Sequence, residues 1–156
     1  MIKKYNSSED TLKHVAEVQT LMHLIYRGLL DRSANHDRSK LFEPEKPIFD
    51  EFVPKLKETV FGSPEYKEIT SQMKVATDHH NQKNRHHPEH FENGIRGMNL
   101  IDLVEMLCDW KAATKRNKDG DIKKSIEILQ QRFNYSDDLK AILLNTAELL
   151  DSKEES

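Results

Sequence analysis

Cysteine is almost absent from this sequence, with Cys108 the single example among 156 residues. One cysteine excludes an intrachain disulfide framework and a zinc site built from several cysteines. Long apolar runs are also missing: no stretch approaches the roughly 20 residues of a membrane-spanning helix, and the first residues lack the apolar core of a secretory signal. We therefore expect a soluble, cytoplasmic protein without a membrane partner.

An excess of charge of one sign is missing too. Charged residues make up 33% of the sequence, yet the formal net charge is only −3. This balance provides no basic field for nonspecific binding of nucleic acid, so an anionic ligand would have to be bound by local groups. The length favours one compact domain over residues 1–156 and leaves the oligomeric state open.

The hydrophobic periodicity is helical almost throughout, and no strand-like alternation is long enough to indicate a sheet. The sequence therefore predicts an all-α bundle of about six helices. These run from the Ser7/Ser8 cap to Arg32 or Ser33, from Pro47 to about Val60, from Pro64 to about Lys83, over about residues 98–117, from the Asp119-Gly120-Asp121 turn to about Phe133, and from the Ser136-Asp137-Asp138 cap to about Leu150. Residues 84–97 are expected to form an ordered loop, and residues 151–156 a frayed tail.

The fourth predicted helix combines apolar residues around nearly its whole circumference with three acids. Asp102, Glu105 and Asp109 have the spacing i, i+3 and i+7, so they share a stripe only about 60° wide. Ionised carboxylates are almost never buried unless they are paired or bound to a cation. The stripe therefore requires a positive partner, which is either an arginine or lysine from a neighbouring helix or a metal ion.

Histidines are concentrated in two places. Five of the eight lie between His79 and His90, and the doublet His36-Asp37 lies upstream. Imidazole together with carboxylate suits Mn, Fe, Co, Ni or Zn, so the sequence predicts a site for one or two divalent transition-metal ions. In the first helix, His14 falls roughly 60° from the centre of the apolar stripe and His23 roughly 120° away, so His14 can face inward, as a ligand or as a histidine at the edge of the core.

The order of these residues is similar to the order of ligands in the HD superfamily of metal-dependent phosphohydrolases, over about residues 10–116. His36-Asp37-Arg38-Ser39-Lys40 resembles the His-Asp-x-x-Lys form of the doublet, and His86-His87-Pro88-Glu89 resembles the double histidine of the HD-GYP branch. The Gly-Tyr-Pro element of that branch is replaced by Phe91-Glu92-Asn93-Gly94, which leaves no basis for cyclic di-GMP as substrate. The chain also resembles a small HD-like family without an assigned function.

The resemblance implies which residues bind metal. His14, His36, Asp37 and Asp109 would hold one ion, and Asp37 would bridge to a second ion held by His80 and by His86 or His87. The loop between His87 and Asp109 is shorter than in the HD-GYP branch, so Asp102 is a rival to Asp109.

The resemblance also implies hydrolysis of a small phosphomonoester or phosphodiester, with nucleotides among the candidates, by attack of a metal-bound water. Lys40 would contact the substrate phosphate, and Glu105 would orient the water or a ligand histidine, unless it only pairs with a nearby arginine. Arg32, Arg85 and Lys111 are further candidates for phosphate binding. Two alternatives stay open: an HD-like di-iron oxygenase or oxidase, and a noncatalytic metal-binding helical protein.

Overall fold

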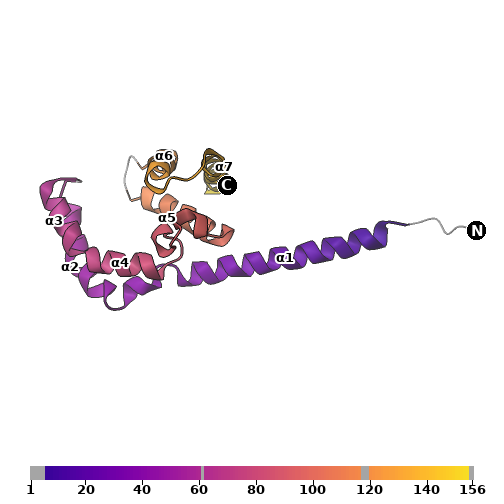
Figure 1. Ribbon diagram of the computed structural model, residues 1–156, viewed down its shortest axis with the longest axis horizontal. Helices are drawn as coiled ribbons and strands as arrows, with labels where there is room; N and C mark the ends of the chain where they lie inside the picture. Colours follow the sequence, from indigo (N-terminus) through magenta and orange to yellow (C-terminus); the bar gives the residue numbers. More distant parts are fainter. Residues whose placement is uncertain (1–5, 61, 117–119, 155–156) are drawn as a thin grey trace, which may run out of the picture. The chain divides into compact units, whose positions relative to one another are not determined.

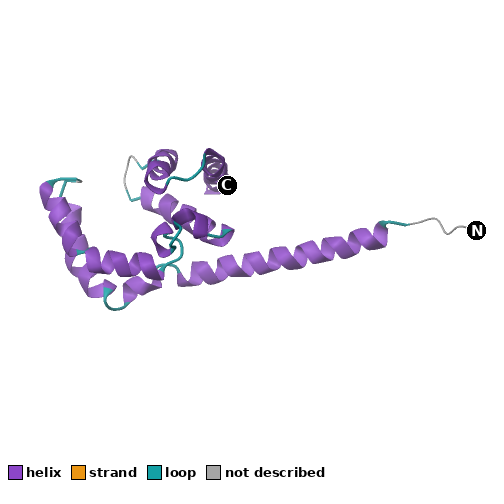
Figure 2. Cartoon of the chain, viewed as in Figure 1, coloured by secondary structure: helices purple, strands orange, loops and turns teal. Residues whose placement is uncertain are grey.

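The computed structural model describes residues 6–60, 62–116 and 120–154, and all regular secondary structure in these segments is helical (Figure 2). This confirms the prediction of an all-α protein. The helices are α1 (Ser8–Asn35), η1 (Arg38–Leu41), α2 (Glu45–Glu58), α3 (Pro64–Gln72), α4 (Lys74–Lys83), η2 (Pro88–His90), η3 (Gly94–Gly97), α5 (Leu100–Thr114), α6 (Ile122–Phe133) and α7 (Asp137–Glu154), where η denotes a 3₁₀ helix. None of the helices in the described residues is long and apolar enough to cross a membrane.

Two of the predicted helices differ from the observed helices in where they begin or end. The third predicted helix is two helices, α3 and α4, because the ψ of Met73 is −5° rather than the roughly −42° of a regular α-helix. The second begins at Glu45, before Pro47. Pro47 therefore lies in the first turn of α2, where its missing N–H costs no intrahelical hydrogen bond.

The predicted tail is wrong for residues 151–154, because α7 continues to Glu154. Residues 155–156 lie outside the described part of the chain, as does Asp119 of the predicted turn. Asp121 is confirmed as the cap of α6, since its carboxylate accepts hydrogen bonds from the backbone N–H groups of Lys123 and Lys124.

The chain divides into two compact units, Met1–Asn35 and His36–Ser156. The regular structure of the first unit is α1, which has acids in its first turn and Arg32 in its last, as the helix dipole favours. The prediction of one domain over residues 1–156 stays a prediction.

In the second unit, α2 packs against η1, α3 and α4, while α5 packs against α6 and α7 (Figure 1). The hydrophobic core lies among α5, α6 and α7. It consists of Leu107, Ile122, Ile126, Tyr135, Leu143 and Ala147. Trp110 packs against this core and stacks on Phe133, with ring centroids 6.2 Å apart. One side of α5 is thus held by apolar packing, which fixes the direction of the acids it carries.

We expect Ile126→Ala to lower the free energy of unfolding by about 2–5 kcal/mol, because Ile126 is fully buried and the alanine leaves a cavity. Ile128→Ala on the same helix is the matched control, since Ile128 is 67% exposed and should change stability by less than about 0.5 kcal/mol. Urea unfolding of the two variants measures the difference. Equal losses would show that α6 does not pack as described.

Candidate metal centre

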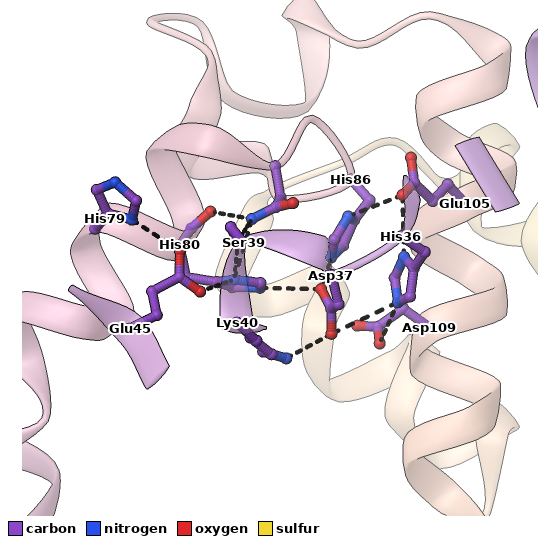
Figure 3. Close-up of polar contacts among 11 residues, drawn as sticks. His36, Asp37, Ser39, Lys40, Glu45, His79, His80, His86, Glu105 and Asp109 are labelled. Carbon is purple, nitrogen blue, oxygen red and sulfur yellow. Dashed lines mark hydrogen bonds and ion pairs between the residues drawn. The ribbon is translucent and has the colours of Figure 1, made fainter. Parts of the chain in front are cut away.

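Asp37 lies at the centre of a cluster of histidines in the second unit (Figure 3). It caps the start of η1 with a φ of 55°, a left-handed conformation that aspartate adopts more readily than most residues. Its Oδ1 lies 3.2 Å from His80 Nε2 and 3.5 Å from His86 Nε2, and its Oδ2 lies 3.7 Å from His36 Nε2. The doublet, α4 and the following loop therefore converge on one carboxylate.

The inner side of this cluster, formed by His80, His86 and His87, is largely buried, and several of its polar atoms lack hydrogen-bond partners. His80 is 4% exposed and His86 2% exposed, and the His87 ring lies against both, with centroids 4.8 Å and 4.2 Å away. In the part of the chain that the structure describes, five buried side-chain polar atoms have no hydrogen-bond partner: Asp37 Oδ1, His80 Nε2, both ring nitrogens of His86, and His87 Nε2.

An unpaired buried polar atom costs about 1–3 kcal/mol, so a cluster of them needs an explanation. One ligand atom each from Asp37, His80, His86 and His87 lies within 4.8 Å of the others. This limit is close to the separation of up to about 4.4 Å between ligands that lie about 2.0–2.2 Å from one ion. The donor set therefore fits a divalent transition metal.

A second group of candidate ligands lies on the other side of Asp37. His36 Nε2 is 3.5 Å from Asp109 Oδ1, and His36, Asp37 and Asp109 bring ligand atoms within 4.8 Å of one another. The three side chains are between 21% and 31% exposed, unlike the buried inner histidines. Three partly exposed protein ligands leave room for water or substrate at this position.

Glu105 contacts the outward-facing nitrogens of two histidines. Its Oε1 accepts a hydrogen bond of 3.0 Å from His36 Nδ1 and lies 3.2 Å from His86 Nδ1. Carboxylates that contact the second nitrogen of a ligand histidine fix its tautomer and orientation. Glu105 can also join His36 and His86 as a third group of candidate ligands.

The acid stripe of α5 serves two different purposes. Asp102 is fully buried and accepts a bidentate pair of hydrogen bonds from Arg85, at 3.1 Å from Nε and 2.9 Å from Nη2. It also forms a capping box with Asn99 at the start of α5. Asp109, and not Asp102, therefore lies beside His36. The guanidinium fork of Arg85, predicted to bind phosphate, is directed at Asp102.

Of the other residues predicted for the site, some lie at the cluster and others do not. Lys40 lies at the cluster, with its Nζ 2.5 Å from Asp37 Oδ2. Lys111 instead pairs with Asp151 on α7. His14 and Arg32 lie on α1, in the first unit, and their roles stay predictions.

The environment of the cluster shifts the pKa of two of its groups. Burial alone would raise the pKa of Asp37, but the hydrogen bond and charge of Lys40 and the charge of His36 oppose it, so the pKa lies well below its usual range. Burial lowers the pKa of His87 to about 3, and the neighbouring His86 and His80 contribute to the shift. An ionised carboxylate beside a neutral imidazole is the protonation state that metal binding requires.

Glu45 was not predicted, and the structure places it behind His80. It is fully buried in the first turn of α2, with Oε1 2.7 Å from His79 Nδ1 and Oε2 2.8 Å from His80 Nδ1. Burial would raise its pKa, but hydrogen bonds from His79, Ser39 and His80 hold the pKa below its usual value. An acid in the first turn of a helix is ordinary in sequence, so no signal identified it.

The shifted pKa of His87 predicts a pH dependence for the chelator-treated protein. The unfolded chain binds a proton at His87 near the ordinary pKa of 6.5, whereas the folded protein does so only near 3. Between these values the unfolded state binds more protons, so the free energy of unfolding falls as the pH is lowered from 6.5 toward 3. His87→Asn should make this fall shallower in urea titrations at several pH values. An unchanged pH dependence would contradict the pKa shift.

The comparisons with known proteins identify a family without identifying an activity. No curated protein and no solved structure matches the chain. Residues 3–149 match the family of unknown function DUF5662, and the chain therefore belongs to that family.

Proposed function

We propose that this protein is a metal-dependent phosphohydrolase that cleaves a small phosphomonoester or phosphodiester. The observation that supports the proposal best is the group of unpaired ring nitrogens of His80, His86 and His87 around Asp37 Oδ1. Such a donor set binds Mn, Fe, Co, Ni or Zn. The resemblance to the HD superfamily supports the same assignment, because from His36 onward the grouped residues follow its order of ligands.

A divalent ion at this centre would activate water as the nucleophile and neutralise the phosphoryl oxygens. Asp37 directs Oδ1 toward His80 and His86 and Oδ2 toward His36, so it can be shared between an inner and an outer ion. The partial exposure of His36 and Asp109 gives a substrate access to the outer position.

Lys40 supplies the cation for the substrate phosphate in this proposal. Its Nζ reaches Asp37 Oδ2, and its side chain is 39% exposed, so it can exchange one anionic partner for another without entering the buried part of the cluster. Glu105 contributes by orienting His36 and His86 and does not itself contact the substrate.

Asp37→Asn should abolish binding of the metal, because the amide cannot serve as an anionic ligand to both groups of histidines. We expect metal affinity and hydrolysis to fall by more than about 100-fold, which exceeds the usual effect of residues that only support ligands. Elemental analysis and circular dichroism of the purified variant give the metal content and the helical content.

His23→Ala is the control for this substitution, since it removes a histidine from α1 that the sequence places away from the apolar stripe. It should retain both metal and activity. Full metal occupancy in Asp37→Asn would rule out the proposed centre.

Metal analysis together with activity assays distinguishes hydrolysis from the alternative functions. The protein purified without chelator is analysed for metals and is then given phosphatase and phosphodiesterase substrates with Mn²⁺ or Co²⁺. Phosphate release supports the proposal. A di-iron signal with oxygen uptake and no phosphate release would favour an oxygenase, and a tightly held ion without either activity would favour a structural metal site.

Lys40→Ala should lower kcat/KM by about 10- to 100-fold, the effect of losing one hydrogen bond to a charged group, while metal content stays unchanged. Lys46→Ala is the matched control, because Lys46 forms an exposed ion pair with Asp50. Steady-state kinetics of the two variants provide the comparison. Equal efficiency in Lys40→Ala and the unsubstituted protein would remove Lys40 from the site.

A further inference from the structure

Glu45 is a buried carboxylate that contacts two imidazoles. Its side chain is 0% exposed, and each of its oxygens contacts one histidine (Figure 3). Oε1 accepts a hydrogen bond from His79 Nδ1, and Oε2 accepts one from His80 Nδ1. An uncompensated buried carboxylate would be very costly, so this arrangement requires both imidazoles to be donors. Glu45 lies outside the groups of candidate metal ligands.

The contact determines which nitrogen of His80 carries the proton. An ionised carboxylate only accepts hydrogen bonds, so Nδ1 of His80 is an N–H, and in the neutral imidazole that a metal requires Nε2 carries the lone pair. That Nε2 is buried, has no hydrogen-bond partner, and lies 3.2 Å from Asp37 Oδ1. The tautomer set by Glu45 is therefore the one that presents a ligand atom to the cluster.

Other side chains hold the same side of the ring. Asn84 Nδ2 donates to the Ser39 hydroxyl at 2.8 Å and to the backbone carbonyl of His80 at 2.8 Å. It also lies 3.0 Å from His80 Nδ1, but these two acceptors take both of its hydrogens, so Nδ1 is left to donate to Glu45. The Ser39 hydroxyl lies 3.3 Å from His80 Nδ1. These contacts limit rotation of the imidazole, while the carboxylate of Glu45 selects its protonated nitrogen.

We propose that Glu45 is a positioning residue that holds His80 with Nδ1 protonated and Nε2 directed at the metal centre, and so raises the affinity for metal. The inference rests on the proposed metal site and assigns it a supporting residue from α2. His79 shares the carboxylate but directs neither nitrogen at the cluster in any described contact, so it is a second partner of Glu45 and not a ligand.

Substitution of Glu45 tests the proposal through titration with Co²⁺ alone, followed by visible absorption. Glu45→Met removes both acceptors and nearly preserves the volume, and it should weaken Co²⁺ binding by about 10- to 100-fold. Glu45→Gln retains one acceptor oxygen and should give an intermediate affinity. His79→Ala is the matched control, because it leaves the contact between Glu45 and His80 in place, and it should change the affinity by less than about threefold.

Two outcomes would overturn the proposal. One is Co²⁺ affinity in Glu45→Met equal to that of the unsubstituted protein, and the other is an equal loss in His79→Ala and Glu45→Met, which would indicate general damage around α2. Circular dichroism and the melting temperature show whether each variant is folded.

A measurement on the unsubstituted, metal-free protein keeps the test decisive if Glu45→Met does not fold. Nitrogen-15 chemical shifts should show His80 protonated at Nδ1, and protonation at Nε2 alone would overturn the assignment. The result is independent of hydrolysis: weaker Co²⁺ binding in Glu45→Met without phosphatase activity in any form would reject the proposed function and retain the role of Glu45. Failure of the unsubstituted protein to bind Co²⁺ would reject both.

Discussion

The arrangement of the second unit depends on the burial of a carboxylate among imidazoles whose inner nitrogens are unpaired. The fold supplies acceptors for two outer nitrogens, through Glu45 behind His80 and Glu105 beside His36. It supplies none for the inner atoms, among them His80 Nε2 and Asp37 Oδ1. Since unpaired polar atoms in an interior destabilise the folded state, this asymmetry supports the proposed position for a cation.

Two kinds of packing bring the cluster together. The apolar core among α5, α6 and α7 fixes the face of α5 that carries Glu105 and Asp109. The bidentate contact of Arg85 with Asp102 fixes the chain next to His86, the first histidine of the pair. A change at Asp102 would therefore disturb the position of His86, although Asp102 is not among the grouped candidate ligands.

The sequence predicted the helical class and most of the residues in the groups of candidate ligands, because periodicity and the order of ligands can both be read from the sequence. It could not separate Asp102 from Asp109, since three acids on one stripe differ only in what packs against them. Glu45 was missed because its partners, His79 and His80, are 34 and 35 residues away. The break at Met73 was missed because α3 and α4 share one continuous helical periodicity. His14 and Arg32 lie on α1, and their predicted roles stay predictions.

The two sides of Asp37 differ in their access to solvent, with His80 and His86 enclosed and His36 and Asp109 partly open. Ions held at the two positions would then exchange at different speeds, since release from the enclosed position requires local opening of the chain. Brief chelation would strip the open position first and leave a half-loaded protein. In the proposed centre, the geometry would thus set an order of assembly as well as a place for binding.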